Sequence, residues 1–246
     1  MQKVSKYLII IIALCITSCA SRKNIVYFQD DNNQTQTNSV YKTILKSDDL
    51  LQITVSALDT EATKPFNLTN NSGEISTPHL YLIDSDGFIN YPVFGKLKLG
   101  GLSKIEAINL LHSKLSPDYI KNPVVNIKIT NFSITVLGDV KNPGLFTIPN
   151  ERITILEAIG LAGDLNITGI RNITIKREEN NVIKNYSLDL RSNNIFNSPA
   201  YYLQQNDVIY IEPNRATSQD AVYNRNTGLF ISIGSILISL ITILTR

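Results

Sequence analysis

Asp84 and Asp86 are the acidic pair whose spacing suits cation binding. They lie in the stretch Asp84-Ser85-Asp86-Gly87, between two short apolar runs. An EF-hand calcium loop needs further oxygen ligands and a bidentate Glu at its end, and the sequence places none there. We therefore favour a turn over a calcium site, with Gly87 supplying a positive φ.

Residues for enzymatic chemistry form no recognisable set. The chain has no paired carboxylates in a known setting, no Cys/His metal spacing, no G-x-S-x-G motif and no phosphate loop. His79 and His112 lie far apart and lack marked partners. A glycosidase would need two carboxylates across a cleft, which only a three-dimensional structure can test. We predict no enzymatic activity, no metal and no cofactor, and the net charge of +2 argues against nucleic acid.

The N-terminus has the pattern of a secretion signal. Lys3 and Lys6 give a positive start, and the apolar run at 7–15 is too short to span a bilayer. Together with the setting of Cys19, this pattern predicts that residues 1–18 are a lipoprotein signal peptide.

Cys19 stands in a setting that indicates a covalent modification. Ile16-Thr17-Ser18-Cys19 resembles a bacterial lipobox. The resemblance implies cleavage before Cys19 and a diacylglyceryl thioether on its sulfur; the alternative is a plain secretory signal with a chance cysteine. Cys15 would be removed with the signal, so Cys19 has no disulfide partner within the chain. Residues 19–40, polar apart from an apolar stretch at 25–28, are predicted to be a lipidated tether.

The segment 227–245 carries no charge over 19 residues. As a helix it would be about 28 Å long, close to the hydrocarbon thickness of a bilayer, so we predict a C-terminal transmembrane helix. Small and hydroxyl residues recur along one side: Gly228, Ser232, Ser235, Ser239 and Thr242. This stripe suits close helix packing or a water-filled lumen, and either role needs several copies. The alternative is a single anchor whose Ser and Thr hydroxyls bond back to its own carbonyls.

The elements between these ends begin with a first mixed unit. The alternating stretch 49–57 predicts a strand, and Pro, Asn and Gly residues at 59–79 predict an irregular loop. Ser103 and Glu106 form a capping box that begins a helix. Its predicted buried face consists of Ile105, Ile108, Leu111 and Leu115.

A second unit follows the same scheme. Two strands are predicted within 122–140, of which the first ends the first unit and the second begins this one, and a turn at Pro143-Gly144 leads into another strand. Thr154 and Glu157 form a second capping box, whose helix ends at Gly163. A hairpin at 172–190 and a strand at 206–214 complete the unit.

The two units share a short echo, because Asp49 and Asp207 each open a D-x-aliphatic-x-I stretch. Strand alternation alone can produce such an echo. The sequence predicts an α+β fold of two small mixed domains followed by the C-terminal helix.

In these motifs the chain resembles the outer-membrane polysaccharide export family, the Wza-type lipoproteins. Residues 41–130 resemble the polysaccharide export domain, and residues 133–212 resemble one β-grasp-like SLBB domain, followed by a linker at 213–226. The first match rests on Tyr41 and the stretches 49–55, 84–115 and 122–129, and the second on 136–148, 154–164 and 206–211. Two positions depart from the family pattern, since Asp48 and Asp164 stand where glycine is usual.

The resemblance implies a transport function. It predicts a homo-oligomeric ring in the outer membrane of a Gram-negative bacterium, with its soluble domains in the periplasm, that exports capsular polysaccharide or exopolysaccharide. The implied partner is an inner-membrane polysaccharide co-polymerase, often a tyrosine kinase. The alternative is a scaffold lipoprotein that binds polysaccharide or a partner without forming a pore. The absence of Trp mildly disfavours tight sugar binding.

Overall fold

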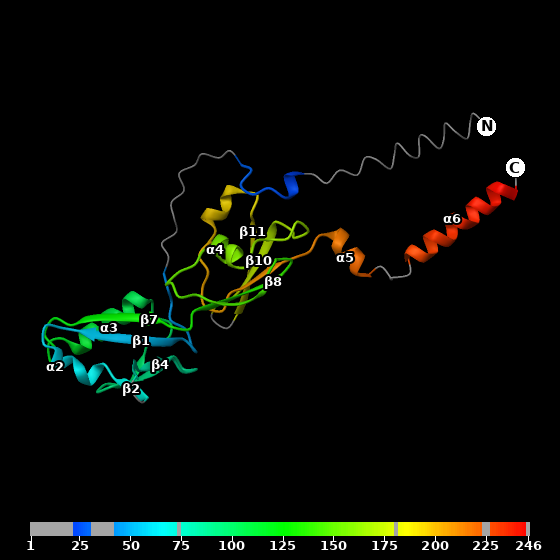
Figure 1. Ribbon diagram of the computed structural model, residues 1–246. Helices are drawn as coiled ribbons and strands as arrows, with labels where there is room; N and C mark the ends of the chain where they lie inside the picture. Colours follow the sequence, from blue (N-terminus) through cyan, green and yellow to red (C-terminus); the bar gives the residue numbers. More distant parts are fainter. Residues whose placement is uncertain (1–21, 31–41, 73–74, 180–181, 223–226, 245–246) are drawn as a thin grey trace.

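A computed structural model of the chain describes residues 22–30, 42–72, 75–179, 182–222 and 227–244 (Figure 1). Helices and several small sheets alternate along the chain, which confirms a mixed α+β fold. Two hydrophobic cores are present, one formed by residues 45–127 and one by residues 132–211. Two domains with separate cores therefore follow one another along the chain.

The first domain is built on a three-stranded sheet. Its central strand β1 (Leu50–Ser56) pairs antiparallel with β4 (Leu80–Leu82) and with β7 (Val124–Ile129). A hairpin of β5 (Phe88–Tyr91) and β6 (Gly95–Lys98) lies beside it, and α3 (Lys104–Leu115) contacts β7. The strand predicted at 49–57 is thereby confirmed.

Helix α3 begins at the predicted capping box, because Ser103 and Glu106 satisfy each other's backbone N–H groups. Its predicted buried face is partly wrong. Leu111 and Leu115 are fully buried, but Ile105 is 70 % exposed and Ala107 takes its place in the core. At about 100° per residue, Ile105 lies about 160° around the helix axis from Ala107 and about 120° from Leu111, so it falls outside the buried face.

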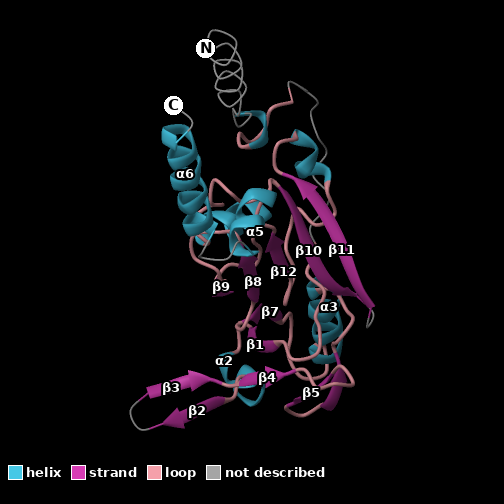
Figure 2. Cartoon of the chain, turned by 90° about the vertical axis from the view of Figure 1, so that its right-hand side faces the viewer, coloured by secondary structure: helices cyan, strands magenta, loops and turns pink. Residues whose placement is uncertain are grey.

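The stretch 59–79 is more regular than predicted. It contains α2 (Thr60–Thr63), the 3₁₀ helix η2 (Lys64–Phe66) and a hairpin of β2 (Thr69–Ser72) and β3 (Ile75–Pro78) (Figure 2). The Asp59 carboxylate accepts the Glu61 and Ala62 amides and so caps α2. The hairpin strands consist mostly of polar residues and lack the apolar alternation that predicts a strand.

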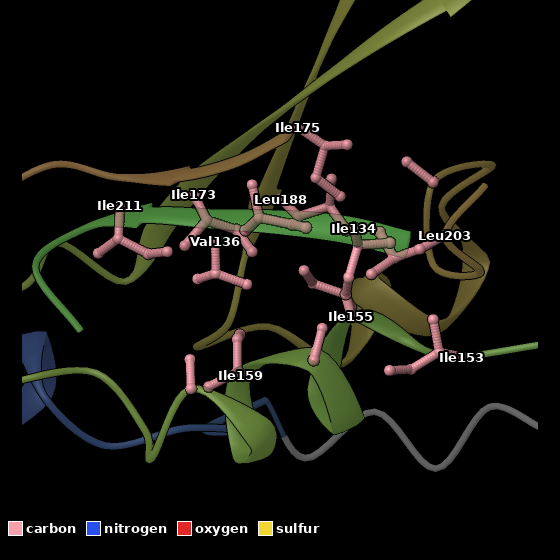
Figure 3. Close-up of a cluster of buried hydrophobic side chains, with 14 of the residues drawn as sticks. Ile134, Val136, Ile153, Ile155, Ile159, Ile173, Ile175, Leu188, Leu203 and Ile211 are labelled. Atoms are coloured by element: carbon pink, nitrogen blue, oxygen red, sulfur yellow. The ribbon is translucent and has the colours of Figure 1, made fainter. Parts of the chain in front are cut away.

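The second domain is a five-stranded mixed sheet with one helix on one face. Figure 3 shows Ile155 and Ile159 of α4 (Ile155–Leu161) pointing toward the sheet residues Ile134, Val136 and Ile173. The strand order is β11-β10-β12-β8-β9, with β12 and β8 parallel and the other pairs antiparallel. The strands are β8 (Ser133–Gly138), β9 (Gly144–Thr147), β10 (Asn172–Glu179), β11 (Val182–Asp189) and β12 (Val208–Ile211). The hairpin and strands predicted for this unit are confirmed, and the 3₁₀ helix η3 (Asn193–Asn197) is an addition.

The helices η1 (Arg22–Asn24), α5 (Arg215–Val222) and α6 (Thr227–Leu244) contribute no described side chain to either core. Helix α5 falls in the predicted linker, and the Asn214 side chain caps it by accepting the Thr217 amide at 3.0 Å. Over the described stretches of the chain, no helix is long and apolar enough to cross a membrane.

Candidate functional site

Asp49 and Asp207, the two aspartates of the sequence echo, occupy the same local turn in the two domains. Both residues are fully buried. Each carboxylate accepts the backbone N–H of the residue three positions earlier, at 2.8 Å in both cases. The preceding residues, Asp48 and Asn206, have φ values of 68° and 66°. The echo therefore reflects a shared turn in addition to strand alternation.

The left-handed backbone explains the two departures from the family pattern. Glycine is usual where φ is positive, and Asp and Asn are the side chains that tolerate this region best. Asp48 has this conformation, and so do Gly163 and Asp164, at 79° and 75°. Both aspartates thus stand at positions whose left-handed backbone glycine adopts readily.

The two turns differ in their electrostatics. Arg177, 2 % exposed, donates to both carboxylate oxygens of Asp207 at 2.9 and 2.7 Å. No described residue forms such an ion pair with Asp49, and none donates a hydrogen bond to its buried Oδ1. Burial raises the pKa of Asp49 to about 6, against the opposing effects of the Lys46 amide and ammonium groups. One turn holds a closed ion pair, and the other holds a carboxyl group with an unsatisfied oxygen.

The junction of the two domains lies next to these turns. The Lys46 ammonium donates to the Glu178 carbonyl oxygen at 3.3 Å, and burial lowers its pKa. Lys104 and Glu151 form an ion pair of 2.5 Å across the same junction. A cleft here is lined by residues of both domains, and Glu151 is the one acidic residue among its described lining residues. The described lining of the cleft therefore supplies one carboxylate, whereas glycosidase chemistry uses two.

The remaining predicted turn residues serve the backbone. Gly87 has a φ of 82°, and the Asp84 carboxylate accepts the Asp86 and Phe88 amides at 3.0 and 2.7 Å. This is the predicted turn, with the carboxylate engaged inside it. Gly144, after Pro143, is the first residue of β9. Among the described residues, no group of three or more His, Cys, Asp or Glu side chains is placed to hold a metal ion.

The predicted stripe lies on α6, and its serines bond within the helix. Ser232 donates to the Gly228 carbonyl at 2.8 Å, Ser235 to the Ser232 carbonyl at 2.8 Å, and Ser239 to the Ser235 carbonyl at 2.9 Å. These side chains are exposed, and the Thr242 side chain lies outside the described part. The apolar side chains of α6 are exposed as well: Leu229, Phe230, Ile231, Ile233, Ile236, Leu237, Ile238, Leu240 and Ile243. An exposed apolar surface of this extent marks contact with a membrane or with another protein.

Residues 22–30, which we call the N-terminal strap, pack on the second domain although the sequence assigned them to a tether. The Tyr27 hydroxyl donates to Asp164 at 2.7 Å, and Arg171, 5 % exposed, donates to the Ile25 carbonyl at 3.0 Å. The apolar stretch at 25–28 was the available sequence signal for this docking. Cys19 itself lies outside the described residues.

Two protein families match consecutive parts of the chain. The family described as polysaccharide biosynthesis/export protein matches residues 37–130, and the SLBB domain matches residues 133–211. The EPS I polysaccharide export outer membrane protein EpsA of Ralstonia solanacearum is 24 % identical over 151 residues, 60 % of this chain and 40 % of that protein. The EpsA protein of Ralstonia nicotianae is 27 % identical over 99 residues, 39 % of this chain and 26 % of that protein. The chain thus spans less than half the length of these relatives.

Proposed function

The chain belongs to the polysaccharide export family, and from this premise we propose that it is an oligomeric outer-membrane lipoprotein that forms an export channel for capsular polysaccharide or exopolysaccharide. The observation that carries the proposal is the pair of consecutive domain matches, which together cover residues 37–211 with a gap of two residues. Two relatives named as polysaccharide export outer membrane proteins match 151 and 99 residues of the chain in sequence.

Two attachments would hold the protein at the membrane. The lipobox-like stretch supports a lipid on Cys19. Helix α6 supports a second attachment, because it exposes apolar side chains along its described length. Its 18 residues correspond to about 27 Å, and the bacterial outer membrane is thinner than the average bilayer. We propose that the predicted C-terminal transmembrane segment, 227–245, inserts there.

A ring of such helices would present the serine stripe either to neighbouring copies or to a lumen. The hydroxyl hydrogens of Ser232, Ser235 and Ser239 are already used inside the helix, so these oxygens would face the partner or the polymer mainly as acceptors. Weak, exchangeable contacts of this kind suit a sliding polymer, since conduction requires release as well as entry. The proposed role is passive, without catalysis, and the proposed partner is an inner-membrane polysaccharide co-polymerase.

A scaffold lipoprotein without a pore is the second candidate. The serine hydroxyls favour it, because each donates within its own helix and needs no neighbouring helix to be satisfied. In that case α6 would be a simple anchor and the soluble domains would bind polysaccharide or a partner protein.

The native mass of the full-length protein in mild detergent separates these candidates. We expect a discrete ring-sized oligomer that loosens or leaves the membrane when the chain is ended at Asn226. A monomer in both preparations would rule out the channel and leave the scaffold.

A substitution pair tests the stripe itself. Ser235→Leu should weaken assembly and polymer export, whereas Ile236→Leu, an apolar exchange at the neighbouring position, should leave both unchanged. Equal behaviour of the two variants would show that the stripe has no role.

A further inference from the structure

The N-terminal strap and the segment that follows the second domain are both hydrogen-bonded to one loop, residues 164–171. On the N-terminal side, Tyr27 of the strap donates to Asp164 at 2.7 Å. Arg171 donates to the Ile25 carbonyl at 3.0 Å, and its guanidinium group lies 5.7 Å from the Tyr27 ring centre. The same guanidinium group donates to the Gly169 carbonyl inside the loop, so it joins the strap to the loop.

On the C-terminal side, the chain that leads toward α5 and α6 pairs with the same loop. Ile170 donates its amide hydrogen to the Glu212 carbonyl at 2.8 Å. The Asn214 amide donates to the Thr168 carbonyl at 2.8 Å, and Gly169 forms a β-bridge with Pro213. The routes toward the proposed lipid and the proposed membrane helix therefore leave the domain side by side.

This loop lies at the end of the second domain that is remote from the first domain. Strand β10 runs from Asn172, directly after the loop, to Glu179, and Glu178 contacts Lys46 of the first domain. Six residue steps along a strand separate Asn172 from Glu178, which corresponds to about 20 Å. Figure 1 shows α5 and the blue η1 at this end, with β1 and α3 of the first domain at the other.

The chain between the lipidation position and the strap is short. Three residue steps lead from Cys19 to Arg22, the first residue of η1, and an extended chain covers at most about 11 Å in three steps. A lipid on Cys19 would therefore hold the loop end of the second domain close to the bilayer surface.

Ile167 stands in this loop with 74 % of its surface exposed. Its carbonyl oxygen accepts a hydrogen bond from Arg171, while its side chain projects into the solvent. Charges of both signs lie in and against the loop: Asp164 and Arg171 belong to it, and Asp139, Lys141 and Glu212 are hydrogen-bonded to it. A contact with lipid would thus rest on apolar burial more than on charge.

We propose that the loop 164–171 is the membrane-facing surface of the second domain and that Ile167 contacts the boundary between headgroups and acyl chains. This inference rests on the proposed lipid at Cys19.

Fluorescence quenching of a label at position 167 tests the proposal. The full-length lipidated Ile167→Cys protein, labelled with an environment-sensitive dye, is reconstituted in vesicles with and without nitroxide-bearing lipids. Ile183→Cys is the matched control, because Ile183 is 68 % exposed in the same domain, near the far end of the β10–β11 hairpin. We expect at least threefold stronger quenching at 167 than at 183, persisting in high salt because the contact is apolar.

The other outcomes overturn the inference in distinguishable ways. Equal quenching at both positions in protein that floats with the vesicles would refute the membrane contact and leave the lipoprotein assignment standing. A blue-shifted dye at 167 without nitroxide quenching would place a second copy of the chain on the loop instead. Protein that fails to float with the vesicles would refute this inference and the proposed lipid attachment together.

Discussion

Replacing Asp49 by Asn should stabilise the first domain at neutral pH, although the residue is fully buried. The carboxylate keeps one acceptor bond, from the Lys46 amide, and its Oδ1 has no hydrogen-bond partner among the described residues. An amide side chain retains an acceptor for the Lys46 amide and carries no charge. The substitution removes a buried charge that the fold satisfies only in part.

The magnitude follows from the pKa. The folded-state pKa of Asp49 rises from 3.8 to about 6, and one pKa unit corresponds to about 1.4 kcal/mol. The folded state therefore binds the proton of the Asp49 carboxyl group more tightly than the unfolded state does. The contribution of Asp49 to the free energy of unfolding is greatest below about pH 4 and is lost as the pH rises through about 6. Asp49→Asn should therefore gain up to about 3 kcal/mol at pH 8 and almost nothing at pH 4.

Asp207→Asn is the matched substitution in the equivalent turn, and its effect should have the opposite sign. It leaves the buried Arg177 guanidinium group without its counter-charge. Removing one partner of a buried ion pair costs about 3–5 kcal/mol. Comparing the two substitutions thus separates the effect of the Arg177 ion pair on stability from the effect of burying a carboxylate.

Hydrogen exchange of the full-length protein in mild detergent measures both effects locally. Peptides from β1 report on Asp49 and peptides from β12 report on Asp207, each compared with wild type at pH 4 and pH 8 after correction for intrinsic exchange. A loss of β1 protection in Asp49→Asn at pH 8 would refute the argument. So would a gain of equal size at the two pH values, because it would not come from the titration of Asp49.

Three further predictions concern packing and docking. Gly138→Ala should cost about 3 kcal/mol or more, because a Cβ would lie 1.9 Å from a β12 carbonyl oxygen at a φ of 96°; Gly144→Ala, with nothing within 4 Å of its Cβ, should be near neutral in thermal unfolding. Leu111→Ala should cost about 2–5 kcal/mol while the exposed Ile105→Ala costs well under 1 kcal/mol, and equal losses in melting temperature would contradict the observed face of α3. Tyr27→Phe should lower stability by about 1 kcal/mol and speed proteolysis within the N-terminal strap, and unchanged cleavage would show that this hydrogen bond does not hold the strap.

The sequence by itself determined those features that depend on a few neighbouring residues. The capping boxes at Ser103 and Thr154 and the turn at Asp84 formed as predicted, because donor and acceptor lie within four residues of each other. The strands of the second domain also followed from alternation, which a half-buried sheet imposes locally. Ile105 was misassigned because periodicity alone does not say which flank of an amphipathic helix meets the sheet.

Only the tertiary structure decided the contacts between residues far apart in the sequence. Arg177 and Asp207 are 30 positions apart, and Tyr27 and Asp164 are 137 apart. No local pattern marks such pairs, because their meeting depends on how the sheet is ordered and where the chain ends return to it. The unsatisfied Oδ1 of Asp49, the docked strap and the contacts of the loop 164–171 all arise in this way. Burial and charge pairing depend on the assembled fold, whereas the starts of helices and the tight turns depend on neighbouring residues.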